Sequence, residues 1–140
     1  MPPESAPLSL AVYRLEKAWE LLKDARLLFG AGQWASANNR AYYALFHGMR
    51  ALLATKAMDF RKHSAVIAAF NKEFIHAGAM DRTFLTVINN ASIIRNHSDY
   101  DDFYICSQEE TAELIADVAP FLQAVEAYLR FAGCQIPPRE

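Results

Sequence analysis

The sequence contains little of what marks disordered, fibrous or disulfide-built proteins. Its 140 residues include only five glycines, six prolines and two cysteines. This composition excludes collagen-like and low-complexity chains, and two cysteines are too few for a disulfide framework. No apolar run approaches the ~20 residues of a membrane-spanning helix, and the first ten residues lack the segments of a signal peptide. We therefore expect a cytoplasmic protein with reduced thiols.

An excess of positive charge is also missing. Fourteen basic and sixteen acidic residues give a formal net charge of −2. Because sequence-independent binding to nucleic acid needs a basic surface, any contact with RNA must be local. Hydrophobic residues make up 53% of the chain, which is enough to form a core at this length. We expect one domain over residues 8–133, with disordered tails at 1–7 and 134–140.

Strand signals are absent, whereas apolar residues recur at helical spacing. Helices are predicted over residues 8–29, 33–55, 63–77, 81–96 and from 107 onward. Gly30 is suited to end the first helix, Asp81 to cap the fourth, and Ser107 with Glu110 to form a capping box. Pro120 is expected to bend the last helix or break it in two. The prediction is an all-α, antiparallel four- or five-helix up-and-down bundle.

Two short motifs resemble cofactor sites without their required context. Glu73 and His76 have the E-x-x-H spacing of di-iron bundles, but such a site needs a second copy of that motif. The G-x-G-x-x-A string at residues 30–35 follows a predicted helix, whereas a dinucleotide loop follows a strand. We therefore expect no metal and no cofactor.

One face of the second predicted helix is unusually polar. Arg40, Tyr43, His47 and Arg50 recur at three- and four-residue steps and so share a face with Ser36. An ordinary solvated face would be richer in lysine and glutamate. Three interpretations stay open: a partly exposed face bonded to nearby loops, a contact between subunits, or the wall of an anion pocket.

Arg95 continues an apolar stripe of the fourth predicted helix. A guanidinium on a buried face must be paired or must serve a ligand, because burying an unpaired charge is costly. Asn96, His97 and Tyr100 add polar groups suited to acid–base or phosphate chemistry. A structural Arg–Asp anchor and a catalytic site are both consistent with these residues. The stripe consists of Phe84, Ile88 and Ala91, and the candidate partners of Arg95 are Asp99, Asp101 and Asp102.

Three stretches together resemble one known family. They are NRAYYALFH at 39–47, HSAVIAAF at 63–70, and Arg95 followed by Asp99 and Tyr100. In this order they are similar to HEPN-domain proteins, and the last matches the R-x-x-x-D-Y branch of that family. The resemblance extends over about residues 10 to 130 and implies an HEPN-like bundle that forms a homodimer.

The resemblance also implies a toxin–antitoxin role beside a minimal nucleotidyltransferase. Active family members are metal-independent endoribonucleases whose motif places a histidine five to seven residues after an arginine. A histidine near neutral pKa can move a proton of the ribose 2′-OH, and an arginine can stabilise charge on phosphorus. In some pairs the partner modifies a tyrosine after the motif, but Tyr100 and Tyr104 lack that setting.

The chain departs from the nuclease motif where the histidine is expected. Arg95 and Asn96 fit its first positions, but residues 100–102 are Tyr, Asp and Asp. His97 is the nearest imidazole, yet on a continuing helix it lies about 200° from Arg95. The two converge only if the helix ends near Asn96 or if a partner protomer supplies the histidine. His47 is the other candidate.

Two functional hypotheses follow. The first is a dimeric binding module that partners a nucleotidyltransferase and holds nucleotide or RNA. The alternative is a metal-independent endoribonuclease that uses Arg95 and Asn96 with His97 or His47. The expected binding residues are Asp99, Tyr100, Arg40, Tyr43 and His47.

Overall fold

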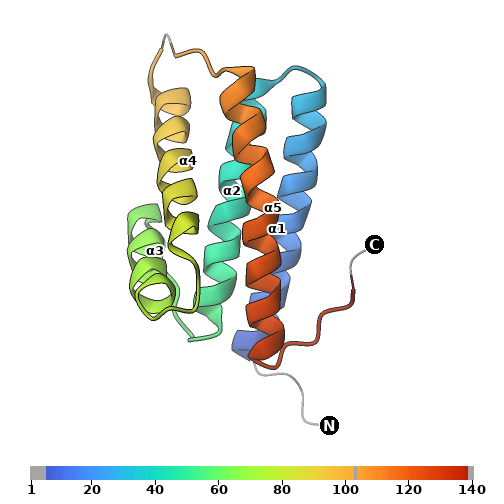
Figure 1. Cartoon of the computed structure of the whole chain (residues 1–140), viewed down its shortest axis with the longest axis vertical. Helices are drawn as coiled ribbons and strands as arrows, with labels where there is room; N and C mark the ends of the chain where they lie inside the picture. The colour runs from blue at the N-terminus through green and yellow to red at the C-terminus, as the bar shows by residue number, and fades with distance from the viewer. Residues whose placement is uncertain (1–5, 103, 139–140) are drawn as a thin grey trace.

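Every regular element that the structure describes is helical, which confirms the all-α prediction. The computed structural model describes residues 6–102 and 104–138. Its elements are α1 (Ala6–Gly30), α2 (Trp34–Ala54), α3 (His63–Phe70), a π-helical turn η1 (Asn71–Ile75), α4 (Arg82–Tyr100) and α5 (Gln108–Phe131). The long helices run up and down side by side, and the shorter α3 flanks the lower part of α4 (Figure 1).

The core lies where α1, α2 and α5 pack against one another. Helical spacing brings Tyr42 and Phe46 of α2 into it. Gly48 sets the approach of α2 to α5, because a Cβ there would lie 2.8 Å from the ring of Phe121. The absence of a side chain at this position therefore lets the two helices pack closely.

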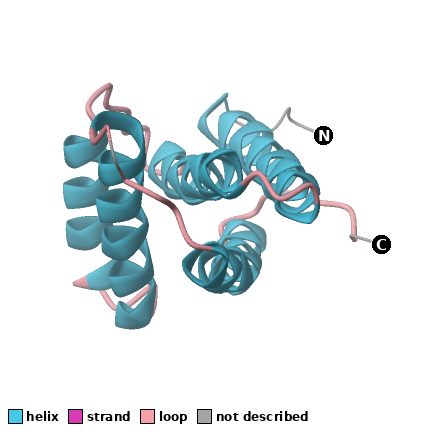
Figure 2. Ribbon diagram, turned by 90° about the horizontal axis from the view of Figure 1, so that it is seen from above, coloured by secondary structure: helices cyan, strands magenta, loops and turns pink. Residues whose placement is uncertain are grey.

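The α3–α4 pair stands to one side of this core. Seen from above, the pair is separate from the group formed by α1, α2 and α5 (Figure 2). Helix α4 contacts α2 more than α5, and its buried residues are Ile88 and Ala91. Most of α4 therefore remains accessible, with one concave surface toward α3 and another toward α5.

Two predicted helix starts are confirmed. The Asp81 carboxylate accepts a hydrogen bond from the Thr83 backbone N–H at the start of α4. At the start of α5, Ser107 and Glu110 form the reciprocal capping box. Both signals are local, since each side chain satisfies backbone donors within three residues.

Of the two outcomes expected at Pro120, a bend or a break, the break does not occur. Helix α5 runs as one element from Gln108 to Phe131. Pro120 and Ala116 both lie on its exposed side. Water can therefore solvate the carbonyl that loses its intrahelical partner, and the helix continues through the proline.

The ends of the chain are more ordered than expected where they are described. Residues 1–5 and 139–140 of the expected tails lie outside the described residues, but α1 already begins at Ala6. Cys134 and Ile136 are buried, and Arg130 donates a hydrogen bond to the Ile136 carbonyl at 3.1 Å. This part of the C-terminal segment therefore packs on the bundle.

The end of the third predicted helix lies close to its expected position. The third predicted helix ends as η1 at Ile75, and Gly78 follows with a φ of +79°. Both cysteines are buried. Within the described part of the chain, no helix is both long and apolar enough to cross a membrane.

Candidate functional site

A polar pocket lies between α3 and α4. Among its described lining residues, Arg95 is the one charged side chain, and His63 lies beside it. Ile67 and Leu85 supply apolar wall. The remaining polar lining residues are Ser64, Asn71, Asn89, Ser92 and Asn96. One guanidinium surrounded by neutral hydrogen-bonding groups is suited to an anion.

Arg95 is held by partners from α2, α3 and its own helix. Its Nη1 lies 3.3 Å from Nδ1 of His63, and its Nη2 donates to the Tyr43 hydroxyl at 3.3 Å. Its Nε forms an ion pair with Asp99 at 3.3 Å, and the guanidinium carbon lies 5.2 Å from the centre of the Tyr42 ring. The side chain is only 16% exposed. Of the carboxylates named as candidate partners, Asp99 pairs with Arg95.

His63 is a neutral imidazole in this arrangement. A guanidinium can only donate, so Nδ1 of His63 accepts from Arg95 and the ring proton is assigned to Nε2. The same Nδ1 lies 2.9 Å from the Tyr42 hydroxyl. Burial lowers the pKa of His63, and the charges of Arg95 and Arg50 lower it further. The lone pair of His63 is therefore already engaged by two donors.

Aromatic rings fix the position of this imidazole. His63 is the first residue of α3 and its ring centre lies 4.2 Å from that of Phe46. Tyr42 stacks against it at 5.6 Å, and Tyr43 meets it edge-on at the same distance. The rings of α2 thereby shield the contact between α3 and α4, and they favour a cation at Arg95.

The structure does not bring His97 to Arg95 within one protomer. Helix α4 continues past Asn96 to Tyr100, so the two side chains lie about 200° apart around its axis. Nδ1 of His97 bonds to Asp101, and its ring stacks on Tyr104 at 5.4 Å. The pairs Arg95–Asp99 and His97–Asp101 have i,i+4 spacing and stabilise the last turn of α4. The expected helix end near residue 96 is therefore wrong.

His47 lies in a different environment. The charged groups that act on it are Arg50, Lys17 and Arg14, and Arg95 is not among them. Burial first, and then these cations, lower the pKa of His47 to about 4. Near neutral pH it is therefore uncharged.

The remaining expected residues are divided among the pocket, a neighbouring hollow and open surface. Asn96 lines the pocket, and Tyr43 contacts Arg95 directly. Arg40 and Asp99 line a second hollow between α2 and the end of α4. Tyr100 is 71% exposed. The residues on the polar face of α2 therefore lie in several different environments and do not form one site.

Sequence reasoning did not single out His63 and Tyr42 as site residues. Each appeared only inside a stretch that resembles the family, Tyr42 at 39–47 and His63 at 63–70. No periodicity links positions 42, 63 and 95, because they lie on three different helices. The available signal was the family resemblance at 39–47 and 63–70.

A metal centre has no support among the described residues. No group of three or more histidine, cysteine, aspartate or glutamate side chains is placed to hold an ion in residues 6–102 and 104–138. Glu73 of the E-x-x-H motif instead forms an ion pair with Lys56 at 3.4 Å.

The fold and the pocket together define a small helical-bundle domain with a cationic site. The model of the HEPN domain family matches residues 11–128. The chain belongs to the HEPN domain family, and the resemblance seen in the sequence is confirmed.

The chain is similar to several known proteins. A UPF0332 protein of Thermotoga maritima is 38% identical over 81% of this chain and 86% of that protein. Two proteins of Methanocaldococcus jannaschii, each named "Putative toxin", are 34% and 31% identical. The first match covers 82% of this chain and 78% of that protein, and the second covers 83% and 86%.

Proposed function

We propose that this protein is a toxin-like HEPN module that binds the phosphate of a nucleotide or of RNA in the α3–α4 pocket. The observation that carries the proposal is the position of Arg95 as the one charged side chain among the described lining residues, beside neutral polar groups. The two Methanocaldococcus jannaschii relatives, each named "Putative toxin", support the toxin-like part.

The contacts of Arg95 leave capacity for a ligand. Its Nη1 and Nη2 each make one contact at 3.3 Å, which is long for a charge-assisted hydrogen bond. A guanidinium has five N–H donors in a planar fork that suits two phosphate oxygens. Hydroxyl and amide groups such as Ser64 and Asn96 would complete the set of donors around an anion.

The hydrogen bonds that Nδ1 of His63 already accepts favour a binding role for this residue over a catalytic one. A general base needs a free lone pair, and Nδ1 of His63 accepts from Tyr42 and Arg95 instead. Its proton on Nε2 is available only as a hydrogen-bond donor. In this role His63 would help to hold an anion without moving a proton.

The binding proposal is tested with fluorescein-labelled hexauridylate and with ATP. We expect Arg95→Gln to weaken binding of whichever ligand binds by about tenfold or more, because a charge-assisted contact is lost. Arg82→Gln is the matched control, since Arg82 is exposed at the other end of α4. The proposal would be contradicted if the wild-type protein bound neither ligand, or if Arg95→Gln and Arg82→Gln lost the same amount of binding affinity. Thermal melts of each variant establish that it is folded.

The family resemblance extends the proposal to assembly and location. We propose a homodimer that partners a minimal nucleotidyltransferase in the cytoplasm. Light scattering after size exclusion measures the mass of the chain alone and with such an enzyme. A monomer at high concentration would reject the dimer, and separate elution of the two proteins would reject the partnership.

The second candidate function is a metal-independent endoribonuclease. It is favoured by one observation, the placement of an imidazole at 3.3 Å from Arg95. In such a reaction the ribose 2′-oxygen attacks phosphorus and the bond to the 5′-oxygen breaks. The 2′-OH proton goes to a base and another proton goes to the leaving oxygen. His63 would then replace His97 and His47, after releasing Tyr42.

Cleavage of total tRNA in the presence of EDTA separates the two functions. An endoribonuclease of this kind loses cleavage in Arg95→Gln and His63→Ala and keeps it in His97→Ala. Absence of cleavage by folded wild-type protein would reject the enzyme and leave the binding module.

A further inference from the structure

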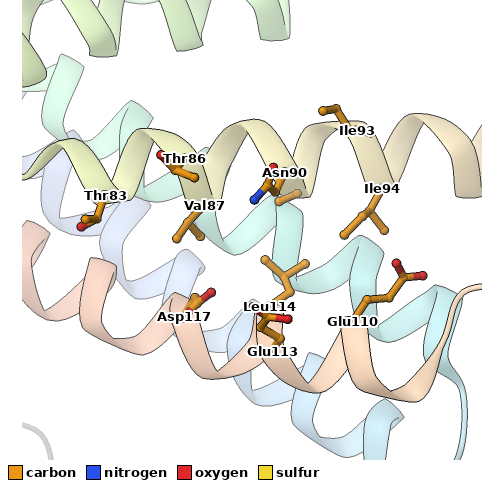
Figure 3. A pocket seen from close by; sticks show the side chains of 11 residues that line it. Thr83, Thr86, Val87, Asn90, Ile93, Ile94, Glu110, Glu113, Leu114 and Asp117 are labelled. Atoms are coloured by element: carbon orange, nitrogen blue, oxygen red, sulfur yellow. The ribbon is translucent and has the colours of Figure 1, made fainter.

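A groove lies between α4 and α5, on the side of α4 that faces away from α3 (Figure 1). Its floor is apolar and is formed by Val87, Ala91 and Ile94 of α4 with Leu114 of α5. Val87 and Ile94 point toward α5, and Leu114 points back toward α4 (Figure 3). Ile93 borders the groove and is 55% exposed. An apolar partner surface could therefore cover this floor and remove it from water.

The two rims of the groove differ in charge. The α4 rim is neutral, and the α5 rim carries carboxylates. No lysine or arginine lines the groove among the residues that the structure describes. The neutral rim consists of Thr83, Thr86 and Asn90, and the acidic rim consists of Glu110, Glu113 and Asp117.

Two of these carboxylates have no cation of their own. Glu110 is occupied by the Tyr104 hydroxyl and by the Ser107 backbone. Glu113 and Asp117 form no ion pair within residues 6–102 and 104–138. Burial raises the pKa of Asp117, and the negative charge of Glu113 raises it further. A positive charge brought to this rim would therefore relieve a repulsion.

We propose that the α4–α5 groove docks an amphipathic helix of a partner protein, with lysine or arginine along one edge of its apolar face. The α4 side of the groove extends from Thr83 to Ile94, which is about 17 Å or three helical turns. Such a helix places apolar anchors at i, i+3, i+4 and i+7 on the floor. Glu113 and Asp117 have i,i+4 spacing, which matches basic residues three or four positions apart.

The charge pattern disfavours two other occupants. In a symmetric contact between two copies the same patch meets itself, and this patch carries charges of one sign only. Nucleic acid would bring phosphates to a carboxylate rim. The groove also shares no lining residue with the Arg95 pocket, so this inference does not rest on phosphate binding.

A designed peptide of about 14 residues tests the groove, since shorter helices are marginal in water. It carries leucine at i, i+3, i+4 and i+7 and lysine elsewhere, and a second peptide has glutamate in place of each lysine. Changes in the amide chemical shifts of the ¹⁵N-labelled full chain show where each peptide binds. We expect the lysine peptide to shift residues 83–94 and 110–117 and the glutamate peptide to shift neither.

Two variants of the chain complete the test. The double variant Glu113→Lys/Asp117→Lys reverses both charges, and we expect it to weaken binding of the lysine peptide about tenfold. Glu20→Lys/Asp24→Lys is the control, because it makes the same change at the same spacing on exposed positions of α1. Ile93→Asn removes exposed apolar surface, so it is expected to weaken binding without unfolding the chain.

Any of four results would overturn the proposal. These are no binding of the lysine peptide, equal binding of the glutamate peptide, amide shifts outside the two ranges, or equal weakening in the α1 control. If the charge-reversal variant fails to fold, the comparison of the two peptides and the Ile93→Asn variant still test whether the groove binds a basic helix.

Discussion

Nδ1 of His63 lies 3.3 Å from Nη1 of Arg95, although 32 positions separate the two residues in the chain. The contact joins the first residue of α3 to the last part of α4. It sets the protonation state of His63, because a donor fixed at Nδ1 opposes a proton on that nitrogen.

Removing Arg95 should raise the pKa of His63. Burial is the largest cause of its lowered pKa, and Arg95 is the largest charge that acts with burial. Histidine ring signals followed by NMR against pH should give a value below about 6.5 in the wild type and a higher one in Arg95→Gln. The control Arg82→Gln should leave the value unchanged. An unchanged or lower value in Arg95→Gln would show that Arg95 does not act on His63.

His47 should make the protein less stable in mild acid. Its pKa is about 4 in the folded chain, whereas an exposed histidine titrates near 6.5. The unfolded chain therefore binds a proton first, and stability is lost as the pH falls from about 6.5 to about 4. We expect about 1–2 kcal/mol of this loss to disappear in His47→Gln, after allowance for partial solvent screening.

Urea unfolding at several pH values across that window measures this difference. Because His63 also has a lowered pKa, the comparison is between wild type and His47→Gln at each pH. Parallel stability curves for the two proteins would contradict the assignment to His47.

Gly48→Ala should destabilise the bundle. A Cβ at this position would lie 2.8 Å from Cε2 of Phe121 and 3.0 Å from Cδ2 of Leu122. Both side chains are fully buried, so they have little room to move, and we expect a loss of about 1–3 kcal/mol in the free energy of unfolding. Gly30→Ala is the control, because nothing lies within 4 Å of the Cβ it would add. Equal stability of the two variants would refute the close approach of α2 and α5.

Asp59→Asn should also lower stability. The Asp59 carboxylate accepts from Arg14 at 3.2 Å and from Arg50 at 3.0 Å, and the Arg14 side chain is only 8% exposed. Removing the anion leaves a buried guanidinium without its counter-charge, which we expect to cost about 1–3 kcal/mol. Chemical unfolding of Asp59→Asn beside Asp24→Asn, an exposed aspartate on α1, measures the effect. A loss no larger than that of the control would contradict the role of this ion pair.

Features carried by neighbouring residues were predictable from the sequence. Apolar spacing located the long helices, and the caps at Asp81 and Ser107 marked two of their starts. The pairing of Arg95 with Asp99 was also within reach, because the two side chains share a helix at i,i+4 spacing. In each case the interacting groups lie within one or two turns of each other.

Where the predictions were wrong, the deciding factor was the surroundings of a residue. Pro120 does not interrupt α5 because it lies on the exposed side of that helix. Helix α4 continues past Asn96 to Tyr100, and near its end Arg95 pairs with Asp99 and His97 bonds to Asp101. That extension turns His97 away from Arg95.

The sequence alone determined that this chain is a helical bundle of the HEPN family and that Arg95 needs a partner. The bundle and the need of Arg95 could be predicted because helix formation, capping and the cost of burying a charge depend on residue type and local spacing. The family was indicated separately, by the resemblance of three stretches of the chain. Only the tertiary structure decided which imidazole meets Arg95. His63, Tyr42 and Arg95 belong to three helices, and the packing of α3 and α4 against α2 is what brings them together.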